Sequence, residues 1–101
     1  MGKLSLEKSE WAGNHWPSVE IDPYEYADFL KIISRLCAEF HIALPSIIEG
    51  VDGYIADLLV GDDLIMIHMD NWTFSIATER PEFRDKIFEV LKTMNLKSSF
   101  E

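Results

Sequence analysis

Apolar and polar residues alternate along residues 54–79, in three runs separated by turn residues. The runs read YIADLLV, LIMIHMD and WTFSIATE. Gly61, Asp62 and Asp63 separate the first two runs, and Asp70–Asn71 separates the last two. These residue types favour tight turns, and strict alternation is typical of strands that bury one face only. The pattern therefore predicts an antiparallel meander of three strands.

The alternation also predicts how the three strands pair. A two-residue loop at Asp70–Asn71 places His68 opposite Thr73, with Ser75 diagonal to His68. On the other face the same loop pairs Met69 with Trp72, Ile67 with Phe74 and Ile65 with Ile76. A first loop at Asp62–Asp63 puts Asp57 directly opposite His68, whereas a loop at Gly61–Asp62 puts it diagonal. An acidic neighbour of this kind favours the protonated imidazole.

Two segments have the periodicity of amphipathic helices. In the first, over residues 22–43, Asp22 suits the N-cap, Pro23 the first helical position and Glu25 the third. Its apolar stripe consists of Tyr26, Phe29, Leu30, Ile33, Leu36, Cys37 and Phe40. The second helix begins around Pro81, and its stripe consists of Phe83, Ile87, Val90, Leu91 and Met94.

The segments KLSLEKSEW and PSVEID alternate more weakly and predict an N-terminal hairpin around Gly13–Asn14. Ser46–Glu49 could add a short strand. The expected order is β-β-α-β-β-β-α, in a single α+β domain over residues 1–101. We expect an antiparallel sheet, made of the meander and the hairpin, with both helices packed on one face. The pattern leaves open whether the hairpin joins the main sheet.

Charge is distributed unevenly along the chain. The net charge is −9, from 9 basic and 18 acidic residues, and no lysine or arginine lies between Arg35 and Arg80. Such a chain repels nucleic acid and anionic membranes and attracts basic proteins, unless the charge serves only solubility. No apolar run is long enough to span a bilayer, and the start lacks the apolar core of a secretory signal. We therefore expect a cytoplasmic protein.

Residues that could carry chemistry do not form a strong motif. Cys37 is the only cysteine, which excludes an internal disulfide, and its place on a helical stripe predicts a buried thiol. Asp57, His68 and Ser75 have the residue types of a hydrolytic set, but a flat strand face offers no strained turn or oxyanion donors. His68 and Asp70 could bind a metal, although two ligands make a weak signal. We expect no enzymatic activity, cofactor or metal.

The face of the meander turned away from the core combines polar with apolar residues. Ile55, Leu59, Leu64 and Met66 share it with Asp57 and His68. Apolar area with an acidic rim is typical of a protein-binding surface, although the N-terminal hairpin or a second copy of the chain could cover it. Trp11 and Trp16 could anchor an interface or cap the core.

The basic-free interval CAEFHIALPSIIEGVDGYIADLLVGDDLIMIHMDNWTFSIATE, together with a meander and neighbouring helices, resembles bacterial immunity proteins, which neutralise cognate toxins. The resemblance implies inhibition of one basic toxin, such as a nuclease, by one acidic protein. The partner-binding residues expected on this basis are Asp52, Asp57, Asp62, Asp63, His68, Asp70 and Trp72. Two alternatives are a homodimeric regulatory or housekeeping module and a metal-binding domain that uses His68 and Asp70.

Overall fold

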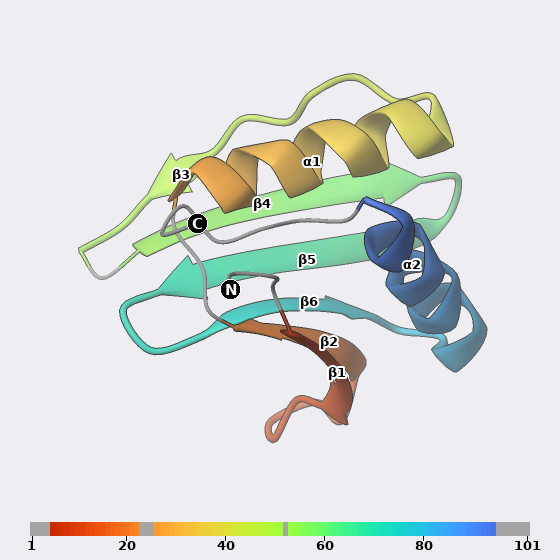
Figure 1. Ribbon diagram of the computed structural model, residues 1–101, viewed down its shortest axis with the longest axis horizontal. Coiled ribbons are helices and arrows are strands. Elements are labelled where there is room, and N and C mark those ends of the chain that lie inside the picture. The colour runs from red at the N-terminus through yellow and green to blue at the C-terminus, as the bar shows by residue number, and fades with distance from the viewer. Residues whose placement is uncertain (1–4, 23–25, 52, 95–101) are drawn as a thin grey trace.

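The computed structural model describes residues 5–22, 26–51 and 53–94 of the chain (Figure 1). The elements are β1 (Ser5–Glu10), β2 (Pro17–Asp22), α1 (Tyr26–Phe40), β3 (Ile48–Glu49), β4 (Gly53–Val60), β5 (Asp63–Asp70), β6 (Phe74–Thr78) and α2 (Pro81–Thr93). All described strands belong to one antiparallel sheet, in the order β1-β2-β6-β5-β4-β3. The predicted α+β fold and element order are confirmed, with β3 as a two-residue addition.

The N-terminal hairpin extends the meander. Its second strand, β2, pairs with β6, so that Val19 lies opposite Ile76 and Glu20 lies opposite Ser75. Val19 and Ile76 are both almost fully buried. This apolar contact draws the hairpin onto the sheet and settles the point that the sequence pattern left open.

The turn between β4 and β5 consists of Gly61 and Asp62. Val60 pairs with Asp63, and Gly61 has a φ of 63°, a left-handed conformation that glycine adopts without steric cost. Asp57 therefore lies opposite Met66 and diagonal to His68. Of the two registers that the sequence allowed, this is the one with the Gly61–Asp62 loop.

The predicted loop between β5 and β6 is wrong by one residue. Its two central residues are Asn71 and Trp72, and the Asp70 N–H donates to the Thr73 carbonyl oxygen at 2.8 Å. The Asp70 side chain explains the difference, because its Oδ1 accepts hydrogen bonds from the backbone N–H groups of Trp72 (2.8 Å) and Thr73 (2.7 Å). Aspartate with these bonds occupies the first position of a turn, before the loop.

This displacement shifts the β5–β6 register by two residues. His68 lies opposite Ser75, where Thr73 was expected, and Ile67 lies opposite Ile76, where Phe74 was expected. Because side chains alternate with a period of two, an even shift keeps the residues within the strands on their predicted faces, although their predicted pairs are wrong. Trp72 is the exception: it was expected beside Met69 on the buried face, but it lies in the turn and is 74% exposed.

Helix α1 presents a buried stripe that is rotated from the expected one. Ile32 is fully buried, whereas Leu30 and Tyr26 are 38% and 42% exposed. The start proposed at Pro23 and Glu25 lies outside the described residues, and Asp22 ends β2. At its C-terminus, His41 has a φ of 57°, and the Ile42 N–H donates to the Cys37 carbonyl. This closing arrangement ends the helix before Pro45.

Both helices pack against the same face of the sheet and enclose the core. Phe29 of α1 contacts Phe74 of β6, with ring centroids 5.8 Å apart, and Phe40 of α1 contacts Phe83 of α2 at 5.2 Å. The buried residues of α2 are Phe83, Ile87, Val90 and Leu91, as expected, and Met94 packs against them. Burial of these apolar side chains is the main source of stability.

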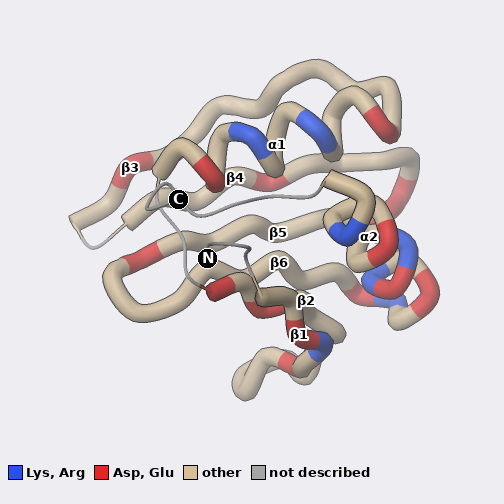
Figure 2. Tube along the Cα trace, viewed as in Figure 1, with Lys and Arg blue, Asp and Glu red and all other residues tan. Residues whose placement is uncertain are grey.

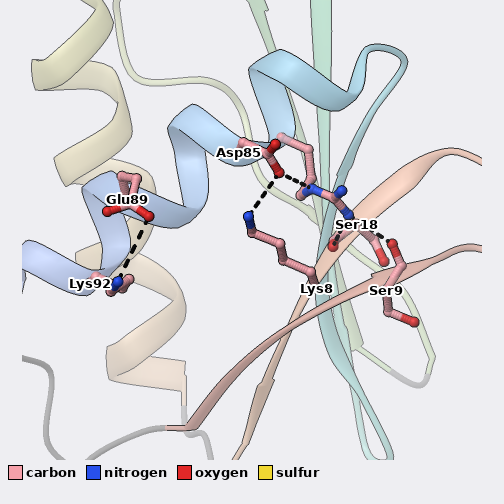
Figure 3. A network of polar contacts seen from close by, with 7 residues as sticks. Lys8, Ser9, Ser18, Asp85, Glu89 and Lys92 are labelled. Carbon is pink, nitrogen blue, oxygen red and sulfur yellow. Dashed lines mark hydrogen bonds and ion pairs between the residues drawn. The ribbon is translucent and has the colours of Figure 1, made fainter.

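Ionic contacts join α2 to the N-terminal hairpin (Figure 3). Asp85 accepts from Arg84 at 2.7 Å and from Lys8 of β1 at 3.1 Å. The Arg84 guanidinium also donates to the backbone carbonyls of Ser9 and Ser18. These contacts orient the basic groups of β1 and early α2 toward the helix side of the sheet.

Candidate functional site

The face of the sheet opposite the helices is called the open face here. One row of directly paired residues crosses it, from β1 to β3: Glu7, Glu20, Ser75, His68, Ile55 and Ile48. Polar residues occupy the β1, β2 and β6 side of this row, and isoleucines occupy the β3 and β4 side. The pairing of β2 with β6 is what brings the two halves together.

The loop between β1 and β2 covers the middle of the open face. The indole N–H of Trp11 donates to Oγ of Ser75 at 2.7 Å, and the indole lies 4.9 Å from the His68 ring. Ser18, Ser75 and Ala77 face outward but are buried. The hairpin therefore covers part of this face, which was one of the alternatives drawn from the sequence.

A chain of hydrogen bonds leads from Trp11 to Glu20. Ser75 accepts from the indole and donates to Oε2 of Glu20 at 2.7 Å, and Ser18 donates to the same oxygen at 2.9 Å. Ser75 lies directly opposite His68, but its hydroxyl is directed to Glu20 and covered by Trp11. Among the described residues, the Ser75 hydroxyl thus bonds to Trp11 and Glu20 rather than to His68, and Ser75 is only 5% exposed.

His68 is half-buried, and its Nε2 atom is buried without a hydrogen-bond partner among the described residues. Burial lowers the pKa of His68, and the nearby carboxylates of Asp57 and Asp70 oppose this shift only in part. The imidazole is therefore neutral at pH 7. The acidic neighbours favour the protonated imidazole, as the sequence predicted for Asp57, but desolvation outweighs their attraction.

The expected partner-binding residues do not form one cluster. Asp62 lies at one end of the β4–β5 hairpin, and Asp70 and the 74% exposed Trp72 lie at the other. Strands of this length separate the two ends by about 23 Å. Asp57 lies between them, exposed on the open face, and Asp52 lies outside the described residues.

Two of these aspartates have structural contacts of their own. Asp63 accepts two hydrogen bonds from Arg80, at 2.9 and 2.6 Å, in a bidentate pair on the helix side. Asp70 holds the β5–β6 turn, and the N–H groups of Trp72 and Thr73 lower its pKa. Of the expected partner-binding aspartates that the structure describes, Asp57 and Asp62 are therefore the two that are exposed to solvent.

Lysines and arginines of the described residues lie away from the open face. They are on the helices, in the segment before α2, and on the helix-facing side of β1: Lys8, Lys31, Arg35, Arg80, Arg84, Lys86 and Lys92. Figure 2 shows this segregation, with blue segments concentrated on α1 and α2. The open face carries Glu7, Glu20, Asp22 and Asp57, and Glu7 is paired directly with Glu20.

Sequence reasoning missed the acidic residues of the N-terminal hairpin. Alternation alone places Glu7 on one face of β1, and Glu20 and Asp22 on one face of β2. Their importance depends on the attachment of β2 to β6, which has no local sequence signal. The open face therefore extends over all six strands rather than the three of the meander.

The apolar part of the open face lies on β3, β4 and β5. Ile48 is 62% exposed, Leu59 61% and Ile55 38%, and Leu64 and Met66 are half-buried beside them. Leu59 and Leu64 form a cross-strand pair. The face thus combines an apolar area with acidic residues along its other half.

A pocket of about 240 Å³ lies at one end of the open face. It is lined by Ile48, Gly50, Gly53, Tyr54, Ile55, His68, Met69 and Asp70. Gly53 is required here, because a Cβ would collide with the Met69 carbonyl oxygen and come within 2.6 Å of the Asp70 Cα. The close approach of the β4 and β5 backbones forms this end of the sheet.

Among the described residues, no three His, Cys, Asp or Glu side chains are grouped as a metal ion requires. The proposed pair of His68 and Asp70 therefore lacks a third protein ligand in this part of the chain. None of the described helices has the length and apolar character needed to cross a bilayer.

Comparisons with known proteins assign no family. Neither a family model, nor a curated protein, nor a solved structure matches the chain.

Proposed function

We propose that this chain is a non-enzymatic binding protein that docks a basic protein on its open face. The observation that carries this proposal is the segregation of charge. Glu7 and Glu20 face each other across β1 and β2, and the described Lys and Arg residues lie elsewhere. Like charges directly opposite one another destabilise a sheet, and a cationic partner would relieve this repulsion.

The rest of the open face suits a protein rather than a small ion. Ile55, Leu59 and Met66 provide apolar area that an interface can desolvate, with Asp57 among them and Glu7 and Glu20 on the other half of the face. Protein interfaces typically combine apolar area with polar residues in this way. Trp11, held by Ser75, gives the surface a rigid aromatic element.

In its specific form, the proposal is that of an immunity protein. Enzymes that act on nucleic acids bind phosphates with basic surfaces. An acidic sheet face is complementary to such a surface and would exclude the substrate by occupying it. The expected activity is therefore inhibition of a basic toxin, such as a nuclease, by a single copy of this chain.

Homodimerisation through the open face is the less favoured function. A twofold interface uses the same patch on both subunits. It would bring the acidic groups of one copy close to those of the other, at a cost in electrostatic energy. Burial of the exposed Ile48 and Leu59 would favour association with another protein. A basic partner can bury these side chains without the repulsion between acidic groups.

The test compares two variants with equal net charge. Glu7→Gln, Asp22→Asn and Asp57→Asn together remove three of the carboxylates of the open face and leave Glu20, which holds Ser18 and Ser75. Glu39→Gln, Glu82→Gln and Glu89→Gln neutralise three exposed or half-exposed acids of the helices. Each set changes the net charge from −9 to −6, since three carboxylates are lost. Wild type and both variants are used to capture partners from lysate of the source cells, and captured proteins are identified by mass spectrometry.

The expected result is one basic protein, bound at one-to-one stoichiometry by wild type and the helix variant but lost from the open-face variant. The purified partner should also lose its catalytic activity when one equivalent of this chain is added. Equal loss from both variants would mean attraction by net charge alone and would refute the proposal. A homodimer in light scattering, without a captured partner, would favour self-association.

A further inference from the structure

The pocket beside β3 has a size that suits one amino-acid side chain. Its volume is about 240 Å³. Pockets for drug-sized ligands and cofactors are typically larger, roughly 300–1,000 Å³. Within the proposed function, the natural occupant is therefore a single side chain of the protein partner.

The pocket has apolar walls that suit a long aliphatic side chain. Ile48 and Ile55 are paired across β3 and β4, and both are exposed. Both isoleucines line the pocket. Lysine and arginine lay their methylene groups along apolar surfaces of this kind while their charged ends reach a polar group.

The polar groups of the pocket suit a cation. His68 and Asp70 line it, and Asp57 is close enough to act electrostatically on His68. The imidazole is neutral and therefore has one acceptor nitrogen. Its Nε2 atom has no partner among the described residues but is itself buried, so the polar side chain that the pocket offers to a ligand is the carboxylate of Asp70. Lysine and arginine carry only donors, so a basic side chain complements this carboxylate, and the neutral imidazole beside it does not repel the cation.

We propose that this pocket receives one lysine or arginine side chain of the basic partner, with its methylene groups between Ile48 and Ile55 and its charged end at Asp70, beside His68. This inference rests on the proposed function and names the anchoring contact within it. An anchor of this type would fix the register of the partner on the open face, while the acids of β1 and β2 attract it less specifically.

The first test uses a small probe and needs no partner. Butylguanidinium is titrated into the 15N-labelled chain, with uncharged butylurea as the matched control, and backbone amide shifts are followed by NMR. Saturable shifts should concentrate at Gly53, Ile55, His68 and Asp70, with butylguanidinium only. Butylammonium, in a third titration, distinguishes a lysine-type from an arginine-type site.

Asp70→Asn is the informative variant, because asparagine retains the side-chain oxygen that accepts from Trp72 and Thr73 while the charge is lost. Asp62→Asn, in the turn at the far end of the hairpin, is the matched control. Asp70→Asn should weaken probe binding by about tenfold, as expected for a charge-assisted hydrogen bond. Asp62→Asn should leave it unchanged.

Shifts spread evenly over the acids of the chain, or equal weakening by both variants, would overturn the cation pocket. The purified partner tests the occupant itself, since Asp70→Asn should weaken its binding by about tenfold as well. If Asp70→Asn binds the partner as tightly as wild type does, the anchor is overturned. A successful capture experiment would not rescue it, because the capture variants leave Asp70 intact. If the probe binds at this pocket but the capture experiment finds no basic partner, the cation pocket stands and the proposed function is overturned.

Discussion

His68 is half-buried near the carboxylates of Asp57, on the neighbouring strand β4, and Asp70, on its own strand β5, and its ring contacts the indole of Trp11. Burial lowers its pKa from the ordinary value of 6.5, with Asp57 and Asp70 opposing. The unfolded chain therefore takes up a proton at a higher pH than the folded chain does. Stability rises with pH wherever the unfolded state binds more protons, so acidification below about pH 6.5 should lower the free energy of unfolding.

This pH dependence can be measured by urea denaturation at several pH values between about 7.5 and 5.5. His68→Gln should flatten the profile over this interval. If the profile of His68→Gln is as steep as that of wild type, another group causes the loss of stability.

Trp11 makes a contact that can be removed in two steps. Trp11→Phe removes the hydrogen bond to Ser75 but retains an aromatic ring, so it should lower the free energy of unfolding by about 1 kcal/mol. Trp11→Ala also exposes the covered part of β6 and should cost about 3 kcal/mol. Trp72→Phe, at a residue that is 74% exposed, should change stability by less than about 0.5 kcal/mol.

Chemical denaturation of the three variants provides the measurement. Equal stability of Trp11→Phe and wild type would mean that water replaces the indole at Ser75 without loss.

Alternation along the chain predicted which face each residue within the strands of the meander occupies, but not each residue's partner, nor that Trp72 lies in the turn. The reason lies in Asp70, whose side chain accepts two backbone N–H groups and so becomes the first residue of the turn. Its sequence neighbour Asn71 is an equally good loop residue. Ile32 and Leu30 illustrate a similar limit in α1, since both are apolar and only the packing of the helix decides which is buried.

At the scale of elements, Gly53 joins β4 to β5 at the end nearest β3. Gly53→Ala should lower the free energy of unfolding by about 1–3 kcal/mol, because its Cβ would meet the backbone of Met69 and Asp70. Gly13→Ala is the matched control, since a Cβ there meets nothing within 4 Å. Thermal unfolding of both variants tests this, and equal melting temperatures would show that β4 and β5 can separate without cost.

The hairpin, the meander and α2 followed from local patterns, but the way they join did not. β2 and β6 are far apart in the sequence, and the local sequence of neither strand indicates that the two strands pair. Val19 and Ile76 pair because both need burial, a requirement that many apolar residues share. The acidic half of the open face depends on this pairing, so the candidate site was only partly predictable from the meander.

At the scale of the whole molecule, charge on the open face should govern the rate of association with a basic partner. Asp57→Lys should lower the association rate constant by about tenfold at low salt and weaken its dependence on ionic strength. The dissociation rate should change less. Stopped-flow or biosensor kinetics at several salt concentrations test this, with Glu89→Lys on α2 as the control that leaves the open face intact.

Asp62 and Asp63 are also among the partner-binding residues expected from the sequence, but reversing their charges together is less suitable for this test. Asp63 is bound by Arg80, so its reversal would also break a bidentate contact on the helix side. A slower association of that variant could then reflect a change of structure. An association rate that responds equally to Asp57→Lys and Glu89→Lys would contradict steering by the open face.

The segregation of Lys and Arg onto the helix side gives the molecule an electric dipole directed across the sheet. A dipole feels a torque in the field of a charged surface, so the chain turns before it touches one. Toward a positively charged surface it presents β1 and β2, with the helices behind. Toward a negatively charged surface it presents α1 and α2. The same protein therefore meets opposite surfaces with opposite sides, and immobilisation on a cationic support would hide its open face.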